Sequence, residues 1–268
     1  MLQVDNISIQ YGDERVLGNF SCHIAQGEFA CITGVSGCGK TSLLRSFIGL
    51  TPLVEGVIRV GEHMLDEHTC SAIRCRVAYL PQDLALPYDT VHEAVCHVLK
   101  IGGLKYECSM KLRLVKSLVK LGLDEDLLDK RLAEVSGGQR QRLMLAVLSL
   151  LDREVWLLDE PTAALDPIAE SEMYQKYNEM TSGKSSIYIS HRLASTRFCD
   201  RIIMIADGGI GEEGTHEELI KAGGRYAGNF AVVYLAAGKE NHRQAAGGAG
   251  AGVVTDVYTK ALDTGFDV

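Results

Sequence analysis

The sequence predicts an α/β fold, and three observations support this prediction. Four short stretches are almost continuously apolar, as expected of parallel strands covered on both faces: 29–33, 77–80, 155–158 and 186–190. Between residues 90 and 150 the apolar residues instead recur every three or four positions, which predicts helices. The stretch GVSGCGKT, residues 34–41, lies directly between a predicted strand and a predicted helix. Together these patterns predict a sheet core with a separate helical part.

Composition excludes several classes of protein. The 268 residues are 46% hydrophobic, enough for one large domain or a domain with a subdomain. A formal net charge of −8 argues against nucleic acid as a partner. Residues 1–5 do not begin a basic and apolar leader, and no run reaches 18 apolar residues, so we expect neither a secretory signal nor a membrane span. The eight cysteines include no CxxC pair, which favours reduced thiols in the cytosol.

The N-terminal part predicts a hairpin. Residues 2–11 alternate between apolar and polar, Gly12-Asp13 is typical of a turn, and residues 17–24 return. Tyr11 is compatible with an ordinary strand aromatic or with a ring that stacks on an adenine, and the strand pattern alone favours the first.

The loop at residues 34–41 fits the phosphate-binding pattern GxxxxGK[ST]. Its glycines let the backbone curl so that successive N–H groups point at one polyphosphate, and the following helix adds its positive N-terminal end. Lys40 would reach the β- and γ-phosphates, and the Thr41 hydroxyl would bind Mg²⁺. The predicted nucleotide-binding residues here are Gly34, Val35, Ser36, Gly37, Cys38, Gly39, Lys40, Thr41 and Ser42.

After the first helix the sequence predicts a hairpin at 56–64, the strand 77–80 and a helical insertion. Helices are expected at 90–100, 105–121 and 124–133, with Gly122 as a stop. The basic residues of this part favour a solvated face over a binding patch. His92, Cys96 and His97 would suit a metal, but without further ligands core or surface positions are the better explanation.

Ser136-Gly137-Gly138-Gln139 begins another predicted helix with an SxxQ capping box. Two glycines inside a helix start are costly for a purely structural cap. They are explained if a phosphate approaches the backbone there, which adds Ser136, Gly137, Gly138 and Gln139 to the predicted nucleotide contacts.

The last third predicts strands alternating with helices. The buried strand 155–158 ends in Asp159 and Glu160, where Asp159 would hold Mg²⁺ and Glu160 would position or deprotonate a water. Asp166-Pro167 predicts the start of a helix that runs to residue 182. His191 follows the strand 186–190, at the sheet edge where α/β proteins bind ligands. A strand at 201–205, a turn at 207–209 and a helix capped at Thr215 complete the pattern. The tail carries the low-complexity tract 245–252 and is assigned no function.

These motifs together resemble the ATP-binding cassette (ABC) ATPases over residues 1–226. The matches are the phosphate loop, a glutamine loop at Gln82, the signature VSGGQ at 135–139, WLLDEPTAALD at 156–166, His191 as the switch histidine and Tyr11 as the adenine-stacking aromatic. The signature opens with valine where the family usually has leucine. The resemblance implies a P-loop NTPase fold, with a RecA-like mixed sheet core and an antiparallel β subdomain. It also implies a helical subdomain inserted at about 84–150 and a separate tail at 227–268.

The resemblance also implies roles and partners. Lys40 binds phosphate, Asp159 and Thr41 support Mg²⁺, Gln82 contacts metal and water, Glu160 is the general base and His191 steadies the γ-phosphate. Two cassettes, alike or different, would form a head-to-tail dimer with ATP between one phosphate loop and the other subunit's signature. The cofactors implied are ATP and Mg²⁺.

The expected function is the energy-coupling ATPase subunit of a transporter whose membrane-spanning permease subunits are separate chains. It would lie on the cytoplasmic face of the membrane and dock near residues 82–95, through an exposed apolar turn at Leu86 and Tyr88. PTAALDP resembles stand-alone subunits, whereas HRLASTRFCDRI, EEGTHEELI and GGRYA resemble exporter cassettes, so the direction of transport stays open. The alternatives are a soluble assembly ATPase of the iron–sulfur type and a nucleotide-binding regulator without turnover, against which Glu160 and His191 speak.

Overall fold

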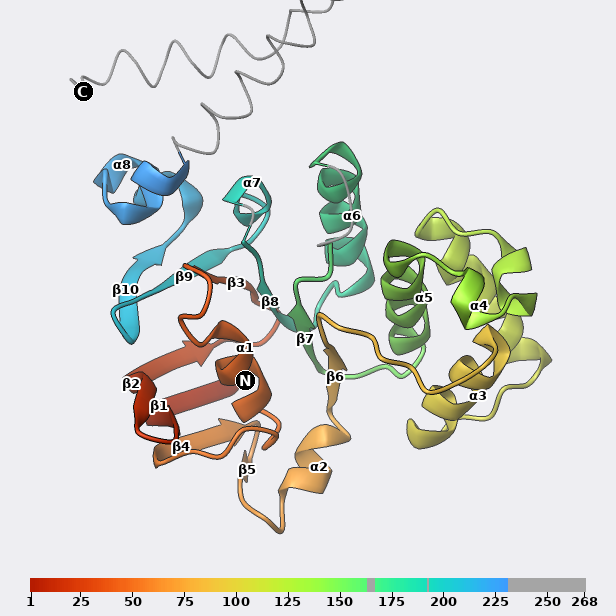
Figure 1. Cartoon of the computed structure of the whole chain (residues 1–268), viewed down its shortest axis with the longest axis horizontal. Helices are drawn as coiled ribbons and strands as arrows, with labels where there is room; N and C mark the ends of the chain where they lie inside the picture. The colour runs from red at the N-terminus through yellow and green to blue at the C-terminus, as the bar shows by residue number, and fades with distance from the viewer. Residues whose placement is uncertain (163–166, 192, 231–268) are drawn as a thin grey trace, which may run out of the picture.

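A computed structural model describes residues 1–162, 167–191 and 193–230. The predicted start of a helix at Asp166 and the low-complexity tract of the tail lie outside these residues. Two sheets form the framework (Figure 1). The first is antiparallel, in the order β2-β1-β4-β5, and its strands are Glu14–Ile24, Leu2–Tyr11, Glu55–Val60 and His63–Met64. The second has the order β10-β9-β3-β8-β7-β6, and its strands are Gly209–Gly214, Arg201–Ala206, Phe29–Gly34, Ser185–Ile189, Val155–Asp159 and Val77–Leu80.

The second sheet lies between two hydrophobic cores, and successive side chains of its strands point alternately into one core and the other. In β3, Phe29 and Cys31 face one core while Ala30 and Ile32 face the other. The strands β6, β7, β8, β3 and β9 run parallel, and β10 pairs antiparallel with β9. Continuous apolar runs are what such a doubly covered sheet requires, so the predicted mixed α/β sheet is confirmed.

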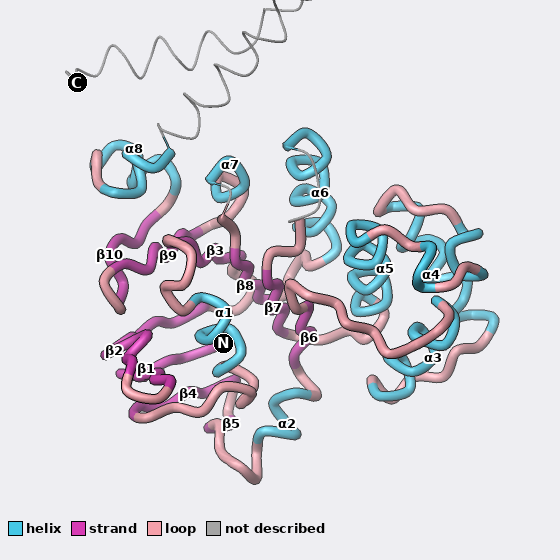
Figure 2. The backbone as a smooth tube through the Cα atoms, viewed as in Figure 1, coloured by secondary structure: helices cyan, strands magenta, loops and turns pink. Residues whose placement is uncertain are grey.

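Helices cover the two faces of this sheet. On one face α1, Lys40–Ser46, is packed between the two sheets. On the other face lies α6, Pro167–Met180, beside a helical lobe (Figures 1 and 2). The helical lobe comprises α3 Val91–Ile101, α4 Cys108–Lys120, α5 Gly137–Ser149 and the 3₁₀ segments η1 Glu125–Asp129 and η2 Leu132–Glu134. Short helices α2 Cys70–Arg74, α7 Leu193–Thr196 and α8 His216–Ala222 complete the described elements.

The predicted third helix of the lobe, at 124–133, is wrong. The chain forms two short 3₁₀ turns there, with residues 130 and 131 extended between them. Backbone pairing explains the break: Val91 N donates to Lys130 O at 3.1 Å, Leu132 N donates to Asp89 O at 2.9 Å, and Thr90 and Arg131 form a β-bridge. Amide and carbonyl groups used in this pairing are lost to an α-helix.

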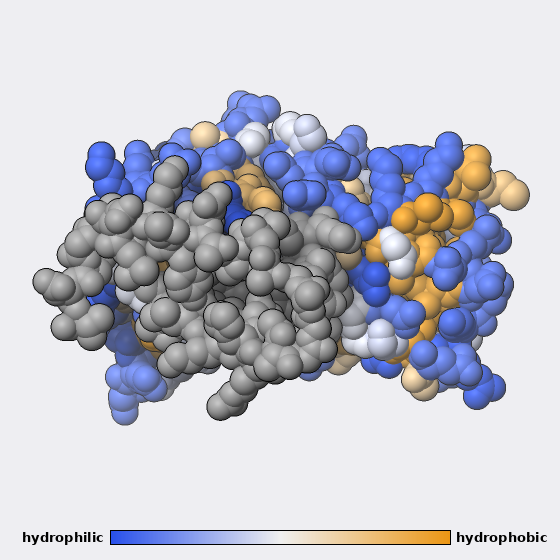
Figure 3. Space-filling view, turned by 90° about the horizontal axis from the view of Figure 1, so that it is seen from above, coloured by the Kyte–Doolittle hydropathy of each residue, from blue (hydrophilic) through white to orange (hydrophobic). Residues whose placement is uncertain are grey.

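The surface of the helical lobe carries apolar side chains among polar ones (Figure 3). The large hydrophobic residues exposed on its helices are Ile101, Leu112 and Val119. Within the described part of the chain, no helix is both long and apolar enough to cross a bilayer.

Candidate active site

The phosphate loop follows β3 and opens α1, as the sequence predicts. Its glycines are required by close approach: a Cβ at Gly34 would lie 2.6 Å from Ile205 O, and one at Gly39 would lie 2.5 Å from Val16 Cγ1. Both residues also have positive φ, at 150° and 94°, which favours glycine. Gly37 faces open space on the side where a Cβ would stand. The loop is therefore tightly backed by β2 and β9 while its outer side is free for a ligand.

The Lys40 side chain is buried inside the curl of this loop. Its Nζ donates to Gly34 O at 3.0 Å and to Val35 O at 2.8 Å. The third contact of Lys40 Nζ is to Cys38 Sγ at 3.8 Å, so it has no anionic partner among these contacts. A phosphate oxygen is a stronger acceptor for an ammonium group than a neutral carbonyl.

Thr41, in the first turn of α1, contacts Asp159, the last residue of β7. The Thr41 hydroxyl donates to Asp159 Oδ1 at 3.2 Å, while Asp159 Oδ2 is buried and has no hydrogen-bond partner among the described residues. Burial raises the pKa of Asp159 to about 6, the Thr41 hydrogen bond lowers it, and the nearby charge of Glu160 raises it. A buried carboxylate with one unused oxygen beside a hydroxyl fits a hard cation such as Mg²⁺.

Glu160 follows Asp159 in the sequence, and its carboxylate contacts two residues from other segments of the chain. Its Oε2 accepts from Gln82 Nε2 at 3.1 Å, and its Oε1 lies 2.6 Å from His191 Nε2. The Glu160 side chain is 14% exposed and that of His191 is 38% exposed. Glu160 also has a φ of 49°, a left-handed conformation that is unfavourable for a residue with a Cβ. Strain of this kind is typical of functional positions.

Tyr11 stands at the end of β1, and its ring is half exposed. Its hydroxyl donates to Ser42 Oγ at 3.1 Å, which anchors the ring beside α1. Hydrogen bonds from the Ser42 and Thr51 side chains to the phenolate oxygen lower the pKa of Tyr11. The Tyr11 hydroxyl thus lies beside the residue that directly follows the phosphate loop.

Ser136 caps α5 through the predicted capping box. Its Oγ accepts from Gln139 N at 3.3 Å, and Gln139 Oε1 accepts from Ser136 N at 3.0 Å. A Cβ at Gly137 would meet nothing within 4 Å. Among the described residues no hydrogen bond joins the signature, 135–139, to the phosphate loop. The structure therefore brings the loop, Asp159, Glu160, Gln82 and His191 together, and it leaves the signature as a separate surface.

Sequence reasoning missed two side chains that support these groups. Arg140 donates from Nε to Val135 O at 3.0 Å and from Nη2 to Leu132 O at 2.7 Å, so it braces the signature. Gln141 is buried and donates to the main-chain oxygens of Gln82 and Glu160. The signal in the sequence was a polar residue on the buried face of α5, one turn before Met144 and Leu145.

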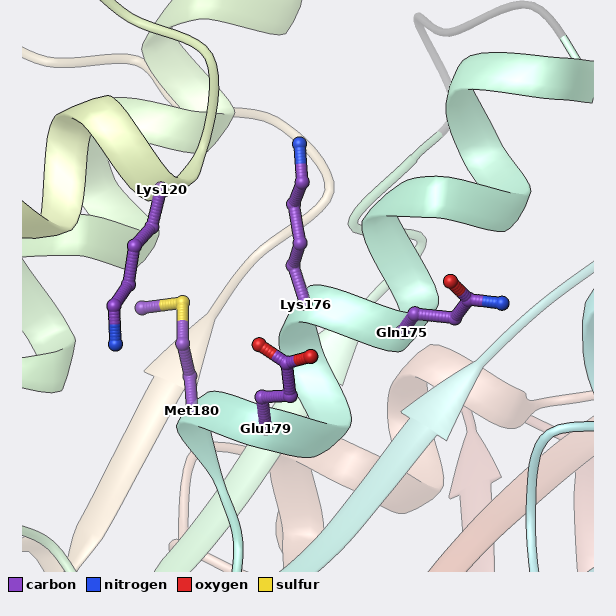
Figure 4. A pocket seen from close by; sticks show the side chains of 5 residues that line it. All are labelled: Lys120, Gln175, Lys176, Glu179 and Met180. Carbon is purple, nitrogen blue, oxygen red and sulfur yellow. The ribbon is translucent and has the colours of Figure 1, made fainter.

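Two of the predicted nucleotide-binding residues are largely exposed, Val35 at 66% and Tyr11 at 52%. A separate hollow of about 260 Å³ lies between α4 and α6, lined by Lys120, Gln175, Lys176, Glu179 and Met180 (Figure 4). None of its lining residues belongs to the predicted nucleotide site.

Comparison with known proteins gives one consistent family. The sequence model described as ABC transporter matches residues 17–163. The ATP-dependent lipid A-core flippase of Cupriavidus metallidurans is 32% identical over 236 residues, which are 85% of this chain and 40% of the flippase. The carnitine transport ATP-binding protein of Listeria monocytogenes is 30% identical over 227 residues, which are 82% of this chain and 57% of that protein. The chain thus spans about two fifths to three fifths of the length of these relatives.

Solved structures agree on the fold. A bacterial Atm1-family ABC exporter with ATP bound superposes with a TM-score of 0.76 at 24% identity, over 86% of this chain and 41% of the exporter. A dimeric ATP-binding cassette in a post-hydrolysis state, with ADP and Pi, gives a TM-score of 0.72 at 27% identity, over 80% of this chain and 98% of that cassette.

Proposed function

The chain belongs to the ABC transporter family, of which it carries the ATP-binding, ATP-hydrolysing cassette, and we propose that its hydrolysis of MgATP drives a membrane transporter. The observation that carries this proposal is the Glu160 carboxylate, held between Gln82 Nε2 and His191 Nε2 at the sheet edge beside Asp159. The two curated relatives are named for the transport of a lipid and of carnitine, which favours a transporter over the iron–sulfur assembly type.

In the proposed reaction the γ-phosphate lies over the phosphate loop. The Lys40 ammonium exchanges loop carbonyls for phosphate oxygens, and Glu160 accepts the proton of the attacking water. His191 and Gln82 fix the Glu160 carboxylate, because each already lies within hydrogen-bond distance of one of its oxygens. Thr41 and Asp159 would hold the Mg²⁺ that accompanies ATP, and the ion would neutralise part of the phosphate charge. Tyr11 would cover the adenine.

We further propose that the signature completes the site of a second cassette. The phosphate loop is open on one side, and the α5 N-terminus presents Gly137 with no atom near its missing Cβ. A head-to-tail dimer would bring this helix start to the γ-phosphate bound by the partner, where its free N–H groups favour an anion. The dimeric cassette with ADP and Pi supports the pairing of two such chains.

This arrangement predicts an ATP-dependent dimer. The Glu160→Gln protein should dimerise when ATP is added, because it binds ATP and turns it over only slowly. Adding Ser136→Arg should abolish the dimer by filling the trans phosphate site. Light scattering with and without ATP measures this. The control is Ser71→Arg, which adds the same side chain at an exposed serine of α2. A dimer that ignores ATP, or that survives Ser136→Arg, would contradict the head-to-tail arrangement.

The proposed docking region for a permease is the loop from Gln82 to the start of α3, which leads from the sheet to the helical lobe (Figure 2). The predicted exposed apolar turn is wrong in one respect: Leu86 and Tyr88 are only partly exposed, because both pack against the lobe core. The exposed apolar positions of this loop are Ala85 and Pro87. These two are the better sites for a test of docking.

We expect Ala85→Glu with Pro87→Glu to leave ATPase activity within about twofold of wild type, because neither side chain contacts the catalytic groups. The double variant should no longer be recovered with membranes of the native cells. Ser71→Glu serves as a control for added charge on a distant helix. If the wild-type protein is wholly soluble and bound to a soluble partner, the transporter proposal fails and an assembly ATPase replaces it.

A further inference from the structure

Gln141 is a buried amide beside the sheet edge that carries Gln82, Asp159 and Glu160, here called the catalytic edge. It lies on α5, five residues after Ser136, and is 6% exposed. Its Nε2 lies 3.3 Å from Gln82 O and 3.4 Å from Glu160 O. An amide nitrogen has two hydrogens, so one can point to each oxygen. Both distances are at the long end for N–H···O bonds, so neither bond is strong by itself.

The two carbonyls are those of the residues whose side chains meet in the site. Gln82 follows β6 and Glu160 follows β7, and these strands are parallel neighbours in the sheet. The Gln82 and Glu160 side chains are already joined by the 3.1 Å bond. Gln82 and Glu160 are therefore linked twice. Their side chains bond to each other, and their main-chain oxygens share the amide of Gln141.

The backbone at Glu160 needs such support. Its φ of 49° is unfavourable for glutamate, and this conformation directs the carboxylate toward Gln82 and His191. Glu160 N donates to Ile189 O at 3.2 Å on β8, and Glu160 O accepts from Gln141. The residue is thus held on its amide side by the sheet and on its carbonyl side by α5.

Stability alone does not explain the choice of glutamine. Gln141 Oε1 is buried without a hydrogen-bond partner among the described residues, and an unmatched buried acceptor is unfavourable. An apolar side chain of the same length would avoid that cost beside its neighbours Met144 and Leu145. What glutamine adds over such a side chain is its two donor hydrogens, which are directed at the main-chain oxygens of Gln82 and Glu160.

We propose that Gln141 is a positioning residue, which holds the main chain of the general base and of the glutamine loop in register with the helix that carries the signature. The site that meets the partner's ATP and the base that acts on the chain's own ATP are thereby linked through one side chain. This inference rests on the proposed ATPase function.

The test is a double-mutant cycle with Glu160 in single-turnover ATP hydrolysis. Gln141→Met keeps the length of the side chain and removes both donors. It should lower the rate about 10–100-fold, as expected for a misplaced catalytic group, while ATP affinity stays within about twofold. In the Glu160→Gln background the same substitution should change the residual rate by less than about twofold, because the group it positions is already gone.

A matched control is Ser149→Ala on the same helix. Ser149 Oγ donates to Ser117 Oγ on α4, away from the catalytic edge, so this variant should hydrolyse ATP at nearly the wild-type rate. Gln141→Glu, which keeps the shape and loses the donors, should reproduce the loss and serves if the methionine variant does not fold. Equal losses in both Glu160 backgrounds, or a rate unchanged in Gln141→Met, would overturn the inference while the ATPase function stands. A wild-type protein without hydrolysis would overturn both.

Discussion

Replacing Glu160 with glutamine should lower ATP turnover by about 10²–10⁴, the usual effect of removing a general base, while ATP binding persists. The amide keeps the shape of the carboxylate and can still accept a hydrogen bond from Gln82 Nε2, but it cannot take the proton of a water. Phosphate release in steady state and equilibrium binding of a fluorescent ATP analogue measure the two quantities.

Glu28→Gln is a control matched in burial. The Glu28 side chain is 14% exposed, as is that of Glu160, and it also accepts a bond from a basic residue, Arg201, at 2.6 Å. Glu28 precedes β3, whereas the phosphate loop follows the opposite end of that strand. The substitution should therefore change stability without changing turnover per folded molecule. Phosphate release from Glu160→Gln within twofold of wild type would remove Glu160 from the role of base.

Gly56→Ala should destabilise the protein far more than Gly27→Ala. Both glycines have positive φ, at 88° and 76°, which costs alanine about 1–2 kcal/mol. A Cβ at Gly56 would also lie 2.5 Å from Asn6 O and from Ile7 Cα, backbone atoms of β1 that cannot turn aside, whereas at Gly27 nothing lies within 4 Å. The added overpacking raises the expected cost at Gly56 to about 2–5 kcal/mol.

Thermal unfolding of the two variants provides the comparison. At about 2–4 °C per kcal/mol for a chain near this size, Gly56→Ala should lower Tm by roughly 5–20 °C, at least twice the shift of Gly27→Ala. Equal shifts would mean that β1 and β4 can separate at Gly56 without loss, against the register found between them.

The parts of the fold that the sequence predicts well are those where burial is unambiguous. The stretch 155–158 is apolar at every position because both faces of its strand are covered, and a run this short favours a strand over a helix. The proposed catalytic groups were predictable for a related reason: Lys40, Asp159, Glu160 and His191 lie at or after the ends of strands that share one sheet edge.

The errors come from pairings between distant segments. Apolar spacing at 124–133 predicts a helix, but the backbone there bonds to residues 89–91, which no local pattern reveals. Likewise β1 changes face between Val4 and Ile7, at Asn6 with its φ of 49°, where Gly56 on the neighbouring strand lies close to it. Gln141 escaped notice because its partners are main-chain atoms 59 and 19 residues away.

The pairing of residues 89–91 with 130–132 also bears on how this chain can vary. It closes the base of an excursion of about forty residues, containing α3, α4 and η1, so that the chain leaves and re-enters the rest of the protein at one place. Loop-closure entropy grows only slowly with length once the two ends are fixed side by side. A change of length within the excursion therefore adds little closure entropy, provided that the faces of α3 and α4 that pack into the core are kept.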